Sequence, residues 1–218
     1  MKTALIFGSS GLVGKNLLNQ IINNSNYSKV KIFVRSSLEI SDQKVEIINT
    51  DFKDLEIVKS RIIGDDCFFC IGTTKKNSSD KSEYRRVELD LPKKIAQISK
   101  SNNVKTFIFV SSGFADPKNS ADYLKFKGLV EEEIKSLNFE KIGILRPSFL
   151  LGNRKEKRIG EKIGILIFKL LSPIFVGPLR KMKPIHSDIV ANSMIKIANN
   201  ELDKTIFESN EIVELSNT

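Results

Sequence analysis

The sequence predicts an α/β protein built on a doubly wound parallel sheet with helices on both faces. Apolar runs of strand length alternate along the chain with segments of helical period. These runs are continuously apolar, as expected for strands that are covered on both faces. The alternation of strand, helix and strand favours a parallel sheet with right-handed connections. With 218 residues, of which 40% are hydrophobic and 28% charged, the chain can fold around one core.

The strands and the clearest helices follow from these patterns. Six strands are expected at residues 3–7, 30–34, 45–48, 67–71, 106–110 and 141–145. Leu17 and Ile21 share one face of a helix after the first strand, and Val130 and Ile134 share one face of a later helix. These helices are the expected cover of the sheet.

Two further helices carry unusual starting residues. The helical pattern of residues 82–100 contains Pro92, which either kinks this helix or restarts it with Asp90 as its cap. The sequence leaves both alternatives open. A last helix is expected from Ser187 to about Ala198, with Ser187 as its N-cap.

The chain is expected to form a single domain over residues 1–218. Within it, residues 1–146 would form a dinucleotide-binding core and residues 147–218 a small substrate or cap region, because the pattern changes after Arg146 to Pro, Gly and basic clusters. The polar segment 72–81 is expected to form a mobile loop after the fourth strand. The sequence does not indicate whether the protein is a monomer or a dimer.

The net charge of +9 favours anionic partners without choosing among them. The basic residues are scattered, and only residues 154–158 and 180–183 are dense in base, so nucleic acid is not an expected partner. The apolar segment 163–171 lies between basic residues. It is interpreted as part of the core or cap, with contact to an acidic membrane surface as the alternative.

The expected location is cytoplasmic. The longest apolar runs fall far short of the roughly 20 residues that a membrane-spanning helix needs. The apolar run that follows Lys2 ends at Gly8, where a secretory signal would continue.

Cys67 and Cys70 form a C-x-x-C pattern that is interpreted as structural. In a strand, residues an odd number apart point to opposite faces, so the two sulfurs cannot meet. The chain has no second pair and only one histidine, so no metal site is expected.

A glycine-rich turn follows the first strand and opens the first helix. Glycine is needed there because the chain turns sharply, its backbone approaches a pyrophosphate, and helix and strand pack closely. This placement favours a dinucleotide site made by Gly8, Ser9, Ser10, Gly11, Leu12, Val13 and Gly14. The alternative is an ordinary glycine-rich turn.

The end of the second strand favours NADP(H) over NAD. An Asp or Glu would suit a free ribose at this point, whereas the sequence has Arg35 and Ser36, followed by Ser37. A cation and hydroxyls suit a 2′-phosphate, and a charge-assisted hydrogen bond contributes about 1.5 to 3 kcal/mol. The alternative for Arg35 is a solvated charge at a strand end.

Candidate catalytic residues follow the fifth strand. Tyr123 and Lys127 are four residues apart and share a helix face, so the ammonium can favour the ionised phenol. Ser112 at the end of the strand could hold a substrate oxygen while Tyr123 transfers a proton to it. Lys127 would also hold the nicotinamide ribose. The alternative is an amphipathic helix with an ordinary tyrosine.

Two polar clusters receive structural interpretations. Glu131–Glu133 is interpreted as a solvated helix face. His186, Ser187 and Asp188 adjoin in sequence but cannot form a hydrolytic triad, because neighbours do not converge on one point.

Taken in order, these motifs resemble the atypical short-chain dehydrogenase/reductases, which have the Rossmann fold, and among them the Tat-interacting-protein-like, NmrA-like oxidoreductases. The resemblance covers nearly the whole chain and includes Leu145-Arg-Pro-Ser148 and His186-Ser-Asp188. It implies Asp51 and Phe52 near the adenine. It also implies cofactor contacts from Ile71, Gly72, Thr73, Ser111, Pro147, Ser148 and Phe149.

Two functions are therefore expected to compete. The first is an NADP(H)-dependent oxidoreductase that transfers a hydride to or from a small carbonyl or alcohol substrate, with Tyr123 as proton donor. The second is a non-catalytic NADP-binding module that binds a protein partner or a membrane surface, because atypical members often keep the cofactor site without catalysis.

Overall fold

The protein is organised around a seven-stranded parallel sheet. The computed structural model describes residues 1–36, 38–152 and 184–218. The strand order is β3-β2-β1-β4-β5-β6-β9. The bounds are β1 Lys2–Phe7, β2 Tyr27–Val34, β3 Val45–Asn49, β4 Asp66–Phe69, β5 Thr106–Val110, β6 Lys141–Arg146 and β9 Ile206–Glu208. The predicted Rossmann-type architecture is confirmed, and a short parallel pair, β7 Leu150–Leu151 with β8 Ile185–His186, lies outside the main sheet.

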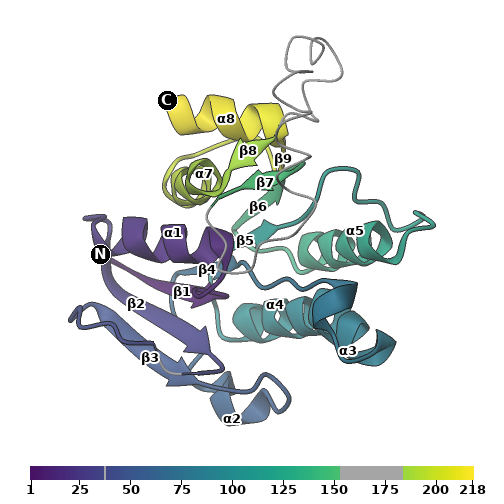
Figure 1. Ribbon diagram of the computed structural model, residues 1–218. Coiled ribbons are helices and arrows are strands. Elements are labelled where there is room, and N and C mark those ends of the chain that lie inside the picture. The colour runs from purple at the N-terminus through teal and green to yellow at the C-terminus, as the bar shows by residue number, and fades with distance from the viewer. Residues whose placement is uncertain (37, 153–183) are drawn as a thin grey trace.

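Helices cover both faces of the sheet (Figure 1). One face packs on α1 Leu12–Ile22 and α7 Ser187–Asn199, with α8 Ser209–Asn217 beside α7. The other face packs on α2 Glu56–Lys59, α4 Leu91–Ser101 and α5 Asp122–Ser136. Short α3, Lys81–Arg85, precedes α4.

The chain reverses its direction of strand addition between β1 and β4. The sheet grows outward from β1 through β2 to β3, and then continues from β4 on the other side of β1. In open parallel sheets the crevice at such a reversal, beyond the carboxyl ends of the strands, is where ligands bind. The topology therefore places the glycine-rich turn after β1 next to the loop after β4.

A row of phenylalanine rings crosses the sheet near its carboxyl edge. Phe7 pairs in register with Phe33 and Phe69, and Phe69 pairs with Phe109. The Phe7 and Phe33 rings stack with centroids 4.4 Å apart. All four rings are buried on the face covered by α4 and α5. They form an apolar layer just before the carboxyl ends of β1, β2, β4 and β5.

The helical stretch with Pro92 contains a π-helical segment, Arg86–Asp90, between α3 and α4. Pro92 lies in the first turn of α4, which starts at Leu91 directly after the π-helical segment. Asp90 stands at the N-cap position of α4, but its side chain makes no capping hydrogen bond; its carboxylate lies 3.6 Å from Arg85. A proline donates no hydrogen bond to the carbonyl four residues back, and the wider π turn absorbs this loss.

Two other details differ from the sequence interpretation. Helix α7 begins at Ser187, whose side chain is no N-cap. Its hydroxyl instead accepts a hydrogen bond from Asn16 of α1 at 2.9 Å. The polar segment 72–81 includes a 3-10 turn, Lys75–Asn77, and Lys75 forms a 3.0 Å ion pair with Asp122 at the start of α5.

Several sequence interpretations fall on residues outside the described ranges. These are Ser37, the basic segments 154–158 and 180–183, and the apolar segment 163–171. Within the part of the chain that the structure describes, no helix has the length and apolarity to span a bilayer. The same residues contain no group of His, Cys, Asp and Glu arranged for a metal ion.

The two cysteines are free thiols on opposite faces of the sheet. Cys67 packs into the α4 and α5 side and Cys70 against the α1 and α7 side. Burial raises the pKa of Cys67 to about 12. Burial likewise raises the pKa of Cys70.

We expect native protein at pH 8 to react slowly with an aromatic disulfide reagent, because the reactive thiolate is disfavoured at both sulfurs. The same protein unfolded in guanidinium should react rapidly and completely. Absorbance of the released thiolate measures both rates. Fast reaction of both thiols in the native protein would contradict the buried placement.

Candidate functional site

The glycine-rich turn brings the start of α1 against the end of β1. A Cβ on Gly14 would lie 2.1 Å from the Gly8 carbonyl oxygen, closer than any side chain tolerates. Gly8 has φ +92, and a Cβ there would lie 2.8 Å from the Ile71 backbone nitrogen. The turn is closed by a 3.0 Å hydrogen bond from Gly11 N to Gly8 O. Only glycine permits this packing of helix, strand and following loop.

The side chains around this turn fit an anionic group. Ser9 is 2% exposed, and within the described part of the chain its Oγ has no hydrogen-bond partner. A buried hydroxyl without a partner costs free energy, which a ligand oxygen would recover. Backbone N–H groups and the positive end of the helix dipole meet at the start of α1. Ser10 and Gly11 are exposed, Leu12 is partly exposed, and Val13 is buried.

The loops after β2 and β3 lie farther along the same edge. Arg35 and Ser36 are exposed at the end of β2. After β3, Asp51 accepts a hydrogen bond from Lys53 N at 2.8 Å. Phe52 is buried with φ 60, a left-handed backbone that is uncommon for a residue with a large side chain.

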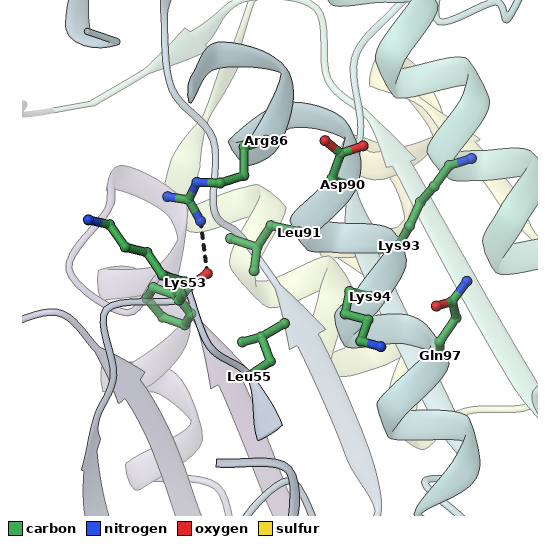
Figure 2. A pocket seen from close by; sticks show the side chains of 9 residues that line it. Lys53, Leu55, Arg86, Asp90, Leu91, Lys93, Lys94 and Gln97 are labelled. Carbon is green, nitrogen blue, oxygen red and sulfur yellow. Dashed lines mark hydrogen bonds between the residues drawn. The ribbon is translucent and has the colours of Figure 1, made fainter. Parts of the chain in front are cut away.

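Arg86 of the π-helical segment fixes the turn at Phe52. Its Nη1 donates to the Phe52 carbonyl at 2.8 Å (Figure 2). A pocket of about 370 Å³ includes both residues of this contact in its lining. Its apolar lining comes from Phe52, Leu55 and Leu91, and its basic lining from Lys53, Arg86, Lys93 and Lys94.

The loop after β4 contacts the same π-helical segment. Thr73 N donates to Glu88 Oε1 at 2.5 Å. A Cβ on Gly72 would lie 3.5 Å from that same oxygen, an ordinary contact distance. Ile71 and Thr73 are partly exposed and Gly72 is exposed. This loop therefore runs over a buried carboxylate.

Lys127 is buried and paired with Glu88. Its Nζ lies 3.0 Å from Glu88 Oε2 and 4.9 Å from the centroid of the Phe109 ring. Burial alone lowers the pKa of Lys127, but the Glu88 carboxylate, with Tyr123 and Glu131, outweighs it and raises that pKa above its usual value. The side chain is thus held as an ammonium.

Tyr123 and Lys127 come together as the spacing predicts. The ammonium lies 5.8 Å from the centroid of the Tyr123 ring, and this tyrosine is 37% exposed. The structure also places the Val110 carbonyl 3.5 Å from the ammonium. Ser112 follows two residues later and is partly exposed, with its hydroxyl 3.4 Å from the Gly113 carbonyl.

Glu131 is not part of a solvated helix face, and that interpretation is wrong. It is 2% exposed and accepts hydrogen bonds from Ser111 Oγ at 2.5 Å and from two nitrogens of Arg146 at 2.9 and 2.5 Å. Arg146 also lies 3.4 Å from Glu208 of β9. A carboxylate with this many charged and hydroxyl donors is satisfied in the interior.

The loop after β6 lies beside the loop after β5. Gly113 N donates to the Pro147 carbonyl at 3.0 Å. Ser148 N donates to Ser209 Oγ at 3.0 Å, so α8 supports this loop. Phe149 is 61% exposed.

The sequence predicted these strand-end loops as parts of the site. It did not indicate Arg86 and Glu88, because their partners are distant along the chain.

Several known proteins are similar to this chain in sequence. A family model described as NAD(P)H-binding matches residues 8–164. Rat HTATIP2 is 34% identical over 164 residues, which cover 73% of this chain and 67% of that protein. FMP52, mitochondrial, of Eremothecium gossypii is 30% identical over 97% of this chain and 96% of that protein.

Solved structures show the same fold at low sequence identity. The Bordetella bronchiseptica enzyme WbmH, solved in complex with NAD+, has a TM-score of 0.73 and 14% identity. The match covers 100% of this chain and 80% of that chain. The chain therefore shares the Rossmann fold of this solved structure.

The expected cytoplasmic location is corrected by these relatives. FMP52 proteins of several fungi, including Saccharomyces cerevisiae and Candida glabrata, are named mitochondrial.

Gly14→Ala should destabilise the protein by about 1–3 kcal/mol, because the new methyl group forces α1 away from the Gly8 carbonyl. Urea denaturation followed by circular dichroism measures this loss. Gly113→Ala is the matched control, since a Cβ there meets its nearest atoms at 3.7 Å. Equal stability of the two variants would contradict the close contact at Gly14.

Proposed function

The chain belongs to the NAD(P)H-binding family, among relatives of HTATIP2 and FMP52 with the Rossmann fold, and we propose that it is an NADP(H)-dependent oxidoreductase of small carbonyls or alcohols. The observation that carries the proposal is the pairing of Tyr123 with a buried ammonium at the edge of the sheet that bears the glycine-rich turn. A bound reduced nicotinamide would supply the hydride.

Cofactor binding would use the strand-end loops in order. Gly8 to Gly14 would hold the diphosphate, with Ser9 Oγ as a buried donor. Asp51 and Phe52 would border the adenine, and Ile71, Gly72 and Thr73 the ribose and phosphates. Ser111 and the loop Pro147–Phe149 would border the nicotinamide.

The preference for NADP(H) rests on Arg35. Its guanidinium lies on an exposed strand end, and Ser36 lies beside it. A phosphate there would accept charge-assisted hydrogen bonds, whereas a ribose hydroxyl would gain less from a cation.

The chemistry of reduction would fall to three side chains. Ser112 would hold the substrate oxygen, and Tyr123 would donate the proton that this oxygen takes up as the alcohol forms. Lys127 would stabilise the tyrosinate left after that transfer, because its charge lies near the ring. In the reverse direction, Tyr123 would accept the proton of the alcohol.

A non-catalytic NADP-binding module is the second candidate. The observation that favours it is the Glu88 partner of Lys127, which neutralises much of the charge that would activate Tyr123. This candidate requires no turnover with any carbonyl and a protein or membrane partner whose binding changes with NADP(H).

The single-domain organisation remains part of the proposal. Residues 1–146 would bind the cofactor, and residues 147–218 would border the substrate. Support comes from β9, which extends the same sheet by pairing with β6. The names of the fungal relatives support a mitochondrial location for this chain as well.

Tyr123→Phe should lower carbonyl-dependent oxidation of NADPH by about 10²–10⁴-fold, because the proton donor is lost. Affinity for NADPH should stay within about twofold, since the ring is kept. A panel of aliphatic and aromatic aldehydes and ketones, followed by NADPH absorbance, provides the assay. Turnover that is unchanged in the variant would remove Tyr123 from the proposed role.

A further inference from the structure

Glu88 is a fully buried carboxylate that joins two parts of the candidate site. Its side chain is 0% exposed and that of its partner Lys127 is 4% exposed. One oxygen lies 3.0 Å from the Lys127 ammonium, and the other accepts the Thr73 backbone N–H at 2.5 Å. An unpaired carboxylate is costly in the interior, so both contacts are needed to keep it there.

The π-helical segment explains how this carboxylate is placed. Pro92 follows Glu88 by four residues and has no N–H for the Glu88 carbonyl. The backbone forms a π-helical segment here, Arg86–Asp90. Such segments are frequent at functional sites. From this one segment, Arg86 reaches the Phe52 carbonyl and Glu88 reaches Thr73 and Lys127.

The other contacts of Lys127 leave the position of its ammonium to Glu88. The Val110 carbonyl lies at 3.5 Å, at the long limit of a hydrogen bond, and the Phe109 and Tyr123 rings attract a cation without fixing a direction. Glu131, a buried acid one turn after Lys127 on α5, is already paired with Arg146 and accepts a hydrogen bond from Ser111. Glu88 is therefore the contact that defines where the charge sits.

We propose that Glu88 is a positioning residue, which holds the Lys127 ammonium and the Gly72–Thr73 loop in register for the nicotinamide-ribose half of NADP(H). The inference rests on the proposed function, because it assigns that half of the cofactor to these groups. Glu88 would not affect binding of the adenosine half, which would lie at the loops after β2 and β3.

The test compares two ligands on the full chain. NADPH contains both halves of the cofactor, whereas adenosine 2′,5′-bisphosphate contains the adenosine and 2′-phosphate without the nicotinamide ribose. Glu88→Gln keeps the shape of the side chain and an acceptor for Thr73 N, but removes the charge that faces Lys127. Glu133→Gln is the matched control, since this partly exposed carboxylate of α5 pairs with Lys93 and accepts a hydrogen bond from Gln97, both on α4.

Glu88→Gln should weaken NADPH binding by about tenfold or more, on the scale of one charge-assisted hydrogen bond. Binding of the bisphosphate should change by less than about twofold. Lys127→Met should weaken NADPH to a similar degree, and the double variant should lose little more, because the two residues act as a unit. Glu133→Gln should leave both affinities as in the wild type.

Other outcomes overturn the proposal. If Glu88→Gln weakens both ligands equally, Glu88 only maintains the fold; if it weakens neither, it does not position the site. A wild-type chain that binds neither ligand would refute the proposed function itself, which separates the two failures. If Glu88→Gln does not fold, Glu88→Asp replaces it, and this shorter carboxylate must also weaken NADPH more than the bisphosphate.

Discussion

The close contact between Gly14 and the Gly8 carbonyl is the constraint on which the rest of the site depends. It seats the start of α1 directly over the end of β1, at the reversal of strand order between β1 and β4. The same glycine turn packs against Cys70 and Ile71, so the loop after β4 must pass alongside it. Ser9, which is 2% exposed, lies within this same turn.

Two of the buried charges around this edge lie on one face of α5. Lys127 and Glu131 are one helical turn apart, and each is paired with an opposite charge from another element. Glu88 comes from the π-helical segment, and Arg146 comes from the end of β6. Removing one partner from such a buried pair typically costs about 3–5 kcal/mol, so these pairs also tie α5 to the sheet and to the preceding helix.

The fold followed from patterns that are local in sequence. Continuous apolar runs predicted the inner strands to within a few residues, and β2 begins earlier than expected because Tyr27 is held by a 2.7 Å hydrogen bond to buried Asp66. The glycine turn and the Tyr123–Lys127 pair were also identified, because each depends on spacing within a few residues.

The missed features depend on partners distant in the chain. Glu131 stands in a run of three acids, and its partners in the interior, Arg146 at the end of β6 and Ser111 after β5, are distant in sequence. No sequence pattern indicated that Glu88 would be buried. Pro92 indicated an irregular helix in this region, but it did not show which side chain would be buried there. Ser187 was predicted to cap its helix. Because α1 packs against α7, its hydroxyl instead accepts a hydrogen bond from Asn16.

The most direct test of this account is an equilibrium titration of the wild-type chain with NADPH and with NADH, followed by the fluorescence of the reduced nicotinamide. The chain contains no tryptophan to interfere. We expect micromolar or tighter binding of NADPH, at least about tenfold tighter than that of NADH, because the 2′-phosphate adds one charge-assisted contact. Equal affinity for the two would contradict the role of Arg35, and no binding of either would contradict the dinucleotide site itself.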